Sequence, residues 1–474
     1  MSRSTASLDR LFHAKSVCIV GASRDERSIP GQALERLVRH GFPGEIHLVN
    51  PKYDEIHGRP CYPSVRDVPA VIDAAMICVP ASVVPAVIED CGAVGVPVAV
   101  VVASGFEETR GGDALAIELR ETALRTGVRI VGPNTEGVWS LVDRVMLTYG
   151  SASAREDLLA GPVSVLSQSG GIGTACIRHL QDRRVGCRYF VGIGNQTDLT
   201  SLDFLEYVVD EGGSPVVLLY TEVLRDGWRL TGIARRAAEK GVRIAVLKSG
   251  SSDAGRRATA THTGRVASAG RIYSSIFRQS GLLEVHTPTE LWEAGETLAI
   301  GGRPPPRRDG TGIGIMSISG GCRSVLADAC DRWGVAMSTF DPATERKLAS
   351  VVPSYGVIEN PVDPSGAVMT TPGLFEGAVR AVAEDPNSDM IIVQYGNGAL
   401  RMVLKHLDFY AALREHVTKP LVLCSLGDDI QPDLRERLNG MSILWASDPD
   451  GAVKRCAWLY QAAGTIPQAE EVAS

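Results

Sequence analysis

The sequence has few aromatic residues, no CxxC pair, no block of Lys and Arg, and no apolar run of the ~18 residues that a membrane span needs. Its ten cysteines are dispersed and several lie in apolar runs, which indicates reduced, packed thiols rather than a disulfide framework or a zinc site. The net charge of -7 comes from charges of both signs scattered along the chain. We therefore expect no nucleic acid or membrane as a principal partner, and no metal site.

The N-terminus, Met1–Arg10, is polar and lacks the apolar core of a secretory signal, which favours a cytoplasmic protein. With 474 residues the chain is too long for one ordinary core, and its length suggests about three domains. The low aromatic content gives no indication of the substrate.

Short apolar runs in the first part of the chain predict buried strands at 16–20, 45–49, 74–79, 96–102 and 128–131. Most are followed by a turn and a helical stretch, and such repeated units predict a parallel sheet with its ligand beyond the carboxyl ends of the strands. The turn after the first strand, Gly21-Ala22-Ser23-Arg24, lacks the G-x-G-x-x-G spacing. It is either a phosphate-binding turn or a tight structural turn.

A second series of strands begins at 161–166 and leads into Ser169-Gly170-Gly171 and a helix at 172–181. Ser and Gly at a helix start leave backbone N–H groups uncovered at the positive helix end, which favours a phosphate site. An ordinary N-cap would account for the Ser alone. The strand 215–220 is followed by Glu222, which is either a surface carboxylate or a group that orients a catalytic imidazole.

The run 259–264 sets His262 among small hydroxyl residues and before a glycine, so little bulk surrounds the ring. Near neutral pH an imidazole can attack a phosphoryl or acyl centre and carry the group covalently. The alternative is a loop histidine that is bonded to a backbone carbonyl.

Consecutive prolines and arginines at 301–309 predict a linker. Beyond it, a strand at 312–318 enters Ser319-Gly320-Gly321 and a helix at 323–333, which repeats the arrangement around Ser169. Further strands are predicted at 390–394 and 420–424. If both helix starts face His262, a phosphohistidine would lie between two positive helix ends.

Five short motifs follow one another in the first part of the chain: Gly21-Ala22-Ser23, Asn50-Pro51-Lys52, Val79-Pro80-Ala81, Ser104-Gly105-Phe106 and Gly132-Pro133-Asn134. In this order and at these intervals they resemble the CoA-binding domain of the NDP-forming acyl-CoA synthetases, a superfamily that includes the succinyl-CoA synthetase alpha subunit. The resemblance covers nearly the whole chain.

The resemblance implies a set of CoA-binding residues. Gly21, Ala22, Ser23 and Arg24 would face the CoA phosphates, Lys52 would add a positive charge, and Val79 and Pro80 would border the adenine or pantetheine. Backbone amides, Lys and Arg suit the several phosphate charges of CoA. The remaining implied CoA contacts are Ser104, Gly105, Phe106 and Asn134.

Thr261-His262-Thr263-Gly264 resembles the histidine loop of the family, and Asn360-Pro361-Val362-Asp363 resembles another of its motifs. The resemblance implies that His262 is phosphorylated, that Glu222 contacts the phosphohistidine, and that two opposed helices hold it. The implied phosphate-binding residues are Ser169, Gly170, Gly171, Thr263, Gly264, Ser319, Gly320 and Gly321.

Some positions depart from the family pattern. Thr135 and Glu136 stand where relatives have Cys followed by Leu or Pro; Glu136 either selects an amine-bearing acyl group or is solvated, and we prefer the solvated interpretation. The other departures are Arg265, Gly270 and Arg271 after the histidine loop, and Cys322 and Arg323 at the second helix start.

The predicted fold is α/β with three doubly wound parallel-sheet domains: a Rossmann-like CoA-binding domain at 8–147 and two flavodoxin-like succinyl-CoA-ligase-type domains at 155–300 and 310–470, the last two joined by the linker 301–309. No stretch remains for an ATP-grasp fold, so ATP or ADP with Mg²⁺ is expected on a separate beta-type subunit.

The predicted function is that of an alpha-type subunit which makes an acyl-CoA from a small carboxylic acid, CoA and ATP through a phosphohistidine and an acyl phosphate. A hetero-oligomer is expected, with a homodimer of alpha chains as a further possibility. The alternatives are a CoA-binding regulatory protein without turnover, which the altered positions motivate, and a nucleotide-independent acyl transferase or hydrolase in which His262 acts as a base.

Overall fold

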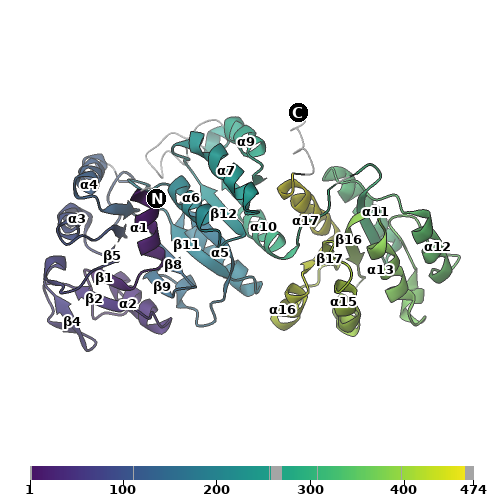
Figure 1. Cartoon of the computed structure of the whole chain (residues 1–474). Helices are drawn as coiled ribbons and strands as arrows, with labels where there is room; N and C mark the ends of the chain where they lie inside the picture. Colours follow the sequence, from purple (N-terminus) through teal and green to yellow (C-terminus); the bar gives the residue numbers. More distant parts are fainter. Residues whose placement is uncertain are drawn as a thin grey trace. The chain divides into compact units, whose positions relative to one another are not determined.

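The computed structural model describes residues 3–109, 111–255, 257, 270–306, 308–396 and 398–464. These residues form three mostly parallel sheets within two compact units, Met1–Gly295 and Glu296–Ser474. The first unit holds two sheets and the second unit holds one (Figure 1). The predicted α/β class with doubly wound parallel sheets is therefore confirmed.

The first sheet has the order β3-β4-β2-β1-β5-β6-β7. Its strands are β1 Ser16–Val20, β2 Glu45–Val49, β3 Glu55–Ile56, β4 Arg59–Tyr62, β5 Ala74–Ile77, β6 Val98–Val101 and β7 Arg129–Val131. The chain leaves β1 for β2 on one side and later returns to β5 on the other. Right-handed crossovers then place α2 (Ile29–Arg39) on one face and α3 (Val84–Ala93) and α4 (Asp113–Thr126) on the other, as Figure 1 shows.

Local sequence explains these elements. All five residues of β1 are buried, as expected for a central parallel strand. Helix α2 begins where the Ser28 hydroxyl accepts a hydrogen bond from the Gly31 N–H, with Pro30 in the first turn. The two sides of β1 meet at a switch in strand order, where α/β sheets bind ligands.

The second sheet has the order β14-β13-β12-β10-β11-β8-β9. Its parallel strands are β10 Ala160–Ser167, β11 Cys187–Gly192, β12 Val216–Thr221, β13 Arg243–Lys248 and β14 Leu283–Val285. The hairpin of β8 (Gly137–Ser140) and β9 (Val145–Thr148) pairs antiparallel with β11. The segment 137–147, which the sequence assigned to the first domain, thus belongs to the second sheet, because the buried residues of β8 pair there.

Further helices among the described residues of the first unit are α1 Arg3–Phe12, α5 Gly170–Asp182, α6 Ser201–Glu211, α7 Leu230–Glu239 and α9 Gly270–Gln279. Polar contacts join the two sheets of the unit. The Arg129 guanidinium donates to both carboxylate oxygens of Asp198 at 2.8 and 3.0 Å, and Asp198 also accepts from the Ile130 N–H. The two sheets therefore fold against each other as one unit.

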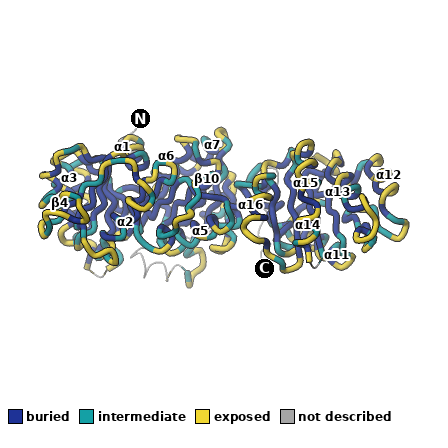
Figure 2. The backbone as a smooth tube through the Cα atoms, turned by 90° about the horizontal axis from the view of Figure 1, so that it is seen from below, coloured by how far each residue is buried: buried dark blue, intermediate teal, exposed yellow. Residues whose placement is uncertain are grey.

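The second unit contains the sheet β15-β16-β17-β18, with strands Gly312–Ser317, Ser388–Gln394, Leu421–Cys424 and Ile443–Ala446. Its main helices are α11 Gly320–Arg332, α12 Pro342–Val351, α13 Leu374–Glu384, α15 Leu407–Arg414, α16 Pro432–Gly440 and α17 Pro449–Ala462. In Figure 2 the sheet strands of each unit are buried and the outer turns of its helices are exposed.

The boundary between the units falls inside α10 (Pro288–Ile300), N-terminal to the linker predicted at 301–309. Glu296 explains this position. Its carboxylate is 1% exposed and pairs with Arg435 at 2.9 Å and with Arg455 at 2.8 Å, so the last turn of α10 is tied to the second unit.

All ten cysteines are unpaired thiols, and all except Cys78 are buried. The prediction of reduced, packed thiols is confirmed. Among the helices that the structure describes, none is long and apolar enough to cross a membrane.

Candidate active site

A pocket of about 540 Å³ lies at the carboxyl ends of β1, β2 and β5, at the switch in strand order. Four of the predicted CoA-binding residues line it: Gly21, Lys52, Val79 and Pro80. The Lys52 side chain is exposed, and Asp90, also in the lining, pairs with Arg66 at 2.5 Å. Four of the predicted residues thus share one pocket, and its lining offers one cation beside apolar walls.

Gly21 is the residue on which the shape of this pocket depends. Its φ of +87° lies in the left-handed region, and a Cβ there would be 2.5 Å from the Cys78 carbonyl oxygen. The Gly21 and Ala22 N–H groups both donate to the Val49 carbonyl, at 2.8 and 3.1 Å. The prediction that these two amides face phosphates is therefore wrong, because the neighbouring strand already uses them.

Arg24 and Asn50 fix the rest of this turn. The Arg24 guanidinium donates to the Glu55 carbonyl at 2.7 and 3.1 Å and lies over the Tyr53 ring. The Asn50 amide donates to the Ala22 carbonyl at 2.7 Å. Arg24 remains exposed beside the pocket, and the Ser23 hydroxyl accepts from the Asp25 N–H at 3.1 Å.

In the loop Ser104-Gly105-Phe106, the last residue departs from its predicted role. Phe106 is fully buried in the core of the first sheet, so its side chain cannot contact a ligand. Glu108, which no sequence motif singled out, accepts the N–H groups of Gly105 at 2.5 Å and Phe106 at 3.1 Å. Burial opposes ionisation of Glu108, but these bonds and one from Asn195 lower its pKa.

Asn195, which follows β11 of the second sheet, hydrogen-bonds to Glu108 and Asn134. Its amide donates to Glu108, and its side-chain oxygen accepts from the Asn134 amide at 3.3 Å. Asn134 is exposed and has a φ of +59°. The loops that end β6 and β7 are thereby fixed at the carboxyl edge of the second sheet.

The start of α5 has the predicted form. The Ser169 hydroxyl caps the helix by accepting from the Ile172 N–H at 3.5 Å, and Gly170 and Gly171 are its first two residues. The Ser167 hydroxyl donates to the Ser169 carbonyl at 2.6 Å and fixes the turn. A Cβ at Gly171 would meet nothing within 4 Å, so the positive helix end opens to space there.

Glu222 and Lys248 lie side by side at the ends of β12 and β13, where Thr221 pairs with Lys248 in the sheet. Glu222 is 6% exposed, and the Tyr220 hydroxyl donates to it at 3.3 Å. It is therefore a buried carboxylate and not a surface one. The Tyr220 hydroxyl oxygen also lies 3.0 Å from the Ser249 hydroxyl, and burial raises the pKa of Tyr220 to about 12.

Lys248 was missed as a site residue, although its position at the end of an apolar strand could have identified it. Its side chain donates to the Ser249 carbonyl and lies 4.9 Å from the centre of the Tyr273 ring. Burial lowers the pKa of its ammonium to about 8, and the Glu222 carboxylate opposes that shift. A buried cation and carboxylate thus stand together at the edge from which the chain continues toward His262.

His262, Thr263 and Gly264 lie outside the described residues, as does Arg265. The described chain stops after Ser249–Gly255 and Arg257 and resumes at α9 with Gly270. Their roles therefore stay predictions.

Glu136 is the departure from the family pattern that the structure explains most fully. One of its carboxylate oxygens, Oε2, is buried, and no described group hydrogen-bonds to it. The solvated interpretation that we preferred from the sequence is therefore wrong. Its neighbour Thr135 is buried, and the Thr135 hydroxyl donates a hydrogen bond to the Gly192 carbonyl.

The second unit repeats the helix start of the first. The Ser317 hydroxyl donates to the Ser319 carbonyl at 2.9 Å, and α11 begins at Gly320-Gly321. Cys322 is buried at 6% exposure, and the Arg323 side chain donates to the Pro361 carbonyl at 2.7 Å. Cys322 and Arg323, the two residues that depart from the family pattern here, therefore make contacts within the second unit.

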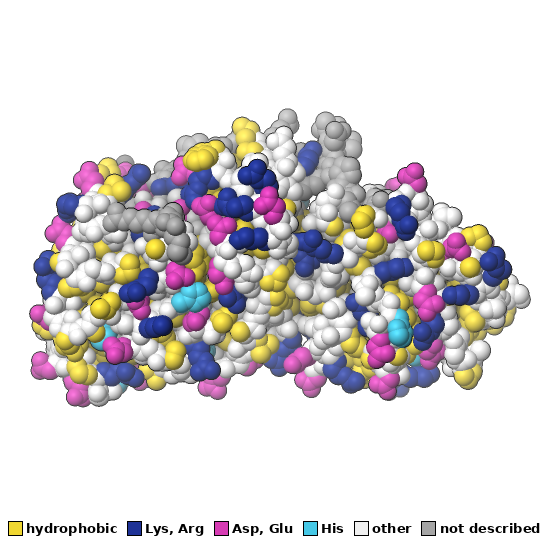
Figure 3. Space-filling view, in the orientation of Figure 1, with side chains coloured by type: hydrophobic (Ala, Val, Ile, Leu, Met, Phe, Trp, Pro, Cys, Tyr) yellow, Lys and Arg dark blue, Asp and Glu magenta, His cyan; other side chains and the backbone are white. Residues whose placement is uncertain are grey.

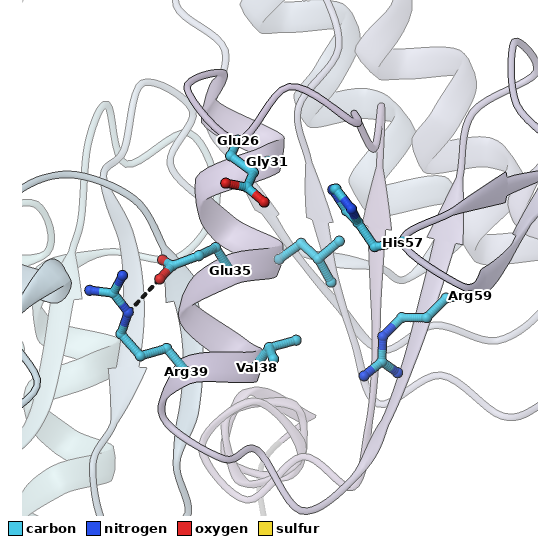
Figure 4. A pocket seen from close by; sticks show the side chains of 8 residues that line it. Glu26, Gly31, Glu35, Val38, Arg39, His57 and Arg59 are labelled. Atoms are coloured by element: carbon cyan, nitrogen blue, oxygen red, sulfur yellow. Dashed lines mark ion pairs between the residues drawn. The ribbon is translucent and has the colours of Figure 1, made fainter.

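A second pocket, of about 380 Å³, lies between α2 and the turn that joins β3 to β4 (Figure 4). Val38 of α2 faces His57 and Arg59 across it, Leu34 also lines it, and Glu35 pairs with Arg39 on the helix. It contains none of the predicted site residues.

On the face drawn in Figure 3, basic and acidic side chains alternate over both units. Between α6 and α7, for example, Arg229 and Arg236 both pair with Glu206, at 2.5 and 2.6 Å. Among the described side chains, no group of three His, Cys, Asp or Glu is placed to hold a metal ion.

The sheet order, the pocket at its switch point and the two Ser-Gly-Gly helix starts define an α/β protein of the CoA-ligase class. Three family descriptions match the chain in order: a CoA binding domain at residues 15–139, a succinyl-CoA ligase like flavodoxin domain at 160–298 and a ligase-CoA domain at 313–437. These correspond to the three sheets.

The chain is 33% identical over 465 residues to the Acetate--CoA ligase [ADP-forming] I subunit alpha of Pyrococcus furiosus, covering 96% of this chain and 97% of that one. The chain therefore belongs to the NDP-forming acyl-CoA synthetases, as an alpha-type member. It is also 33% identical over 448 residues to Acetate--CoA ligase [ADP-forming] I of Archaeoglobus fulgidus, but it covers 94% of its own length and only 62% of that relative's length.

A solved structure with the same fold is the dinucleotide forming acetyl-coenzyme A synthetase 1 of Ca. Korarchaeum cryptofilum in complex with phosphate and ADP. It aligns with a TM-score of 0.87 at 30% identity and covers 97% of each chain.

Proposed function

We propose that this chain is the alpha-type subunit of an ADP-forming acyl-CoA synthetase, which joins a small carboxylic acid to CoA. The reaction would proceed through a phosphohistidine at His262 and an acyl phosphate. ATP or ADP with Mg²⁺ would bind to an ATP-grasp subunit on another chain. The named relatives support the acid and CoA parts of this proposal.

The observation that carries the proposal is the buried pair of Glu222 and Lys248, directly before the segment that holds His262. A buried carboxylate can accept the proton of one imidazole nitrogen and leave the other nucleophilic. The adjacent ammonium provides positive charge for phosphoryl oxygens, and the open helix end at Gly171 adds a partial positive charge in the same unit.

The proposed sequence has three steps. His262 attacks the terminal phosphorus of ATP, so that a P–N bond forms and the P–O bond to ADP breaks. A carboxylate oxygen of the acid then attacks that phosphorus, and the imidazole leaves. Finally the CoA sulfur, having lost its proton, attacks the acyl carbon and displaces inorganic phosphate.

CoA would bind in the pocket at the ends of β1, β2 and β5. Lys52 and Arg24 would meet its phosphates, while Val79 and Pro80 would border its adenine or pantetheine. Gly21 would provide a close backbone approach, and the half-buried Ser23 and the exposed Ser104 and Asn134 would add polar groups. The Gly21 and Ala22 amides are not part of this proposal because Val49 occupies them.

The experiment mixes the chain with the ATP-grasp subunit of the same organism and ATP labelled at the terminal phosphate. We expect label on this chain that is stable to alkali and labile to acid. His262→Ala should lose it, whereas the matched variant His286→Ala, at an exposed histidine of the same unit, should keep it.

Label that persists on His262→Ala would remove that residue from the mechanism. A chain that binds CoA but takes no label and forms no acyl-CoA would instead support the regulatory alternative.

A further inference from the structure

The Glu136 side chain lies against the first residue of α5. A Cβ at Gly170 would be 2.7 Å from both Cγ and Cδ of Glu136, so only a glycine leaves room for this carboxyl group. The Glu136 carbonyl accepts a hydrogen bond from the Thr148 hydroxyl at 2.6 Å, which ties its backbone to β9. The Glu136 backbone is thus held at β9, while its side chain extends to the start of α5.

Its carboxylate is incompletely satisfied. Burial raises the pKa of Glu136, and the nearby Thr174 hydroxyl opposes that shift. The other oxygen, Oε2, is buried and accepts nothing from any described group. A buried acceptor without a donor is costly, and the positive end of α5 offsets only part of that cost. A ligand group that donates a hydrogen bond to Oε2 would remove this cost.

Glu136 also lies near the proposed CoA site. Tyr149 is half-buried, and its pKa is raised first by burial and then by the charges of Glu136 and Cys78. Cys78 lines the pocket at the ends of β1, β2 and β5. Glu136 itself follows β7, the last strand of the first sheet, and its side chain reaches Gly170, so it lies between the carboxyl edge of the first sheet and the start of α5.

If the proposed function holds, the thioester forms between that pocket and the phosphate site, so the acyl group must lie near Glu136. We propose that Glu136 is a specificity residue that selects acyl groups with an ammonium or hydroxyl substituent, which donates a hydrogen bond to Oε2. This inference rests on the proposed function and defines its substrate class as amino- or hydroxy-substituted short carboxylic acids.

The physical reason is the asymmetry of polar recognition. A substituent that donates to Oε2 satisfies a buried acceptor, whereas a methyl group of the same size leaves it unpaired. Sites with such an acceptor discriminate against an apolar isostere more strongly than an apolar pocket discriminates against a missing methylene. We expect at least a tenfold preference.

The test measures acyl-CoA binding to the full chain by calorimetry, and therefore needs no partner subunit. Glycyl-, β-alanyl-, glycolyl- and 3-hydroxypropionyl-CoA are compared with propionyl- and butyryl-CoA, in which a methyl group replaces the donor. The wild-type chain should bind at least one donor-bearing thioester ten times or more tightly than its methyl counterpart, and Glu136→Leu should lose or reverse that preference.

Two further variants keep the result interpretable. Glu136→Gln preserves the volume of the side chain and should still lose the preference for an ammonium, even if Glu136→Leu folds poorly. Glu118→Gln, at an exposed glutamate of α4, should behave as wild type.

Failure of the inference and failure of the proposed function give different results. The specificity role would be overturned if the chain binds CoA but binds donor-bearing and methyl thioesters with equal affinity, both in wild type and in Glu136→Leu. Absence of binding to CoA itself would overturn the CoA assignment on which the role depends.

Discussion

At the scale of single residues, the site is governed by charges that the fold has removed from water. Glu222, Lys248 and Glu136 are all at least partly buried: Glu222 follows β12, Lys248 is the last residue of β13, and Glu136 precedes β8. Burial disfavours the charged forms of Lys248 and Glu136, so such positions are costly unless a partner or ligand compensates. Groups of this kind are enriched at functional sites.

Lys248 allows a direct test of this reasoning. Its pKa of about 8 in the folded chain is below the ~10.4 of an unfolded lysine, so between these values the unfolded state binds more protons and the free energy of unfolding rises with pH. Below pH 8 both states are protonated, and the full cost of burying the ammonium is present.

We therefore expect Lys248→Met to increase the free energy of unfolding by about 1–2 kcal/mol at pH 7, after allowance for the lost contact with the Tyr273 ring, and by less at pH 10. Urea unfolding across this pH range measures both values. Lys52→Met, at an exposed lysine of the same unit, should show no such pH dependence. An equal effect of Lys248→Met at pH 7 and pH 10 would show that burial of the ammonium is not the cause.

At the scale of elements, the strands that carry the site follow from the sequence. The prediction at 16–20 matches β1, that at 45–49 matches β2, and Gly312–Ser317 lies within the predicted 312–318. Buried parallel strands are short, continuous apolar runs, and these are the patterns that a single sequence reveals best. The hairpin of β8 and β9 was not predicted, because its partner β11 is distant in the sequence.

For the turn after β1, the sequence indicated the type of turn but not its hydrogen bonds. A glycine directly after a buried strand predicted a tight turn, but only the paired strand β2 shows that Val49 takes the two amides. The positive φ of Gly21 is therefore structural, and it shapes the pocket without donating to the ligand.

Replacement of Gly21 by Ala would place a methyl group 2.5 Å from the Cys78 carbonyl oxygen at a φ that Ala rarely adopts. We expect the free energy of unfolding to fall by more than about 1 kcal/mol, and the rise in melting temperature on addition of CoA to be reduced or lost. Thermal unfolding with and without CoA measures both.

Gly232→Ala is the matched control, since a Cβ there meets nothing within 4 Å and the residue lies inside helix α7. It should leave the CoA response unchanged and raise stability by up to about 1 kcal/mol. A Gly21→Ala chain with wild-type stability and CoA response would show that the turn tolerates a side chain.

At the scale of the whole molecule, side-chain packing at the end of α10, and not the proline-rich segment, sets the boundary between the two units. The residues Glu296, Arg435 and Arg455 form a buried charged cluster, with the Thr297 hydroxyl accepting from Arg455 at 2.7 Å. These contacts assign the end of α10 to the second unit, although the predicted linker begins only at residue 301.

Removal of the shared carboxylate should destabilise the second unit strongly. Glu296→Ala would leave two guanidinium groups buried without their common partner, for which we expect a loss of about 3–5 kcal/mol in the free energy of unfolding. Urea unfolding followed by hydrogen exchange would assign the loss to strands β15–β18. Glu415→Gln, at an exposed glutamate of the same unit, should change stability by less than about 0.5 kcal/mol.

A loss below about 1 kcal/mol for Glu296→Ala, or one confined to the first unit, would show that the cluster does not hold the end of α10 in place.

The sequence alone determined the α/β class, the order of the strands along the chain and the family, because each depends on local apolar runs and on motifs in a fixed order. Tertiary structure decided which groups are available for chemistry. The Gly21 and Ala22 amides donate to the Val49 carbonyl, and Phe106 is buried. Lys248 lies beside Glu222, and the Glu136 side chain lies against Gly170. These outcomes depend on contacts between segments far apart in the chain, whose burial and hydrogen bonding no local pattern specifies.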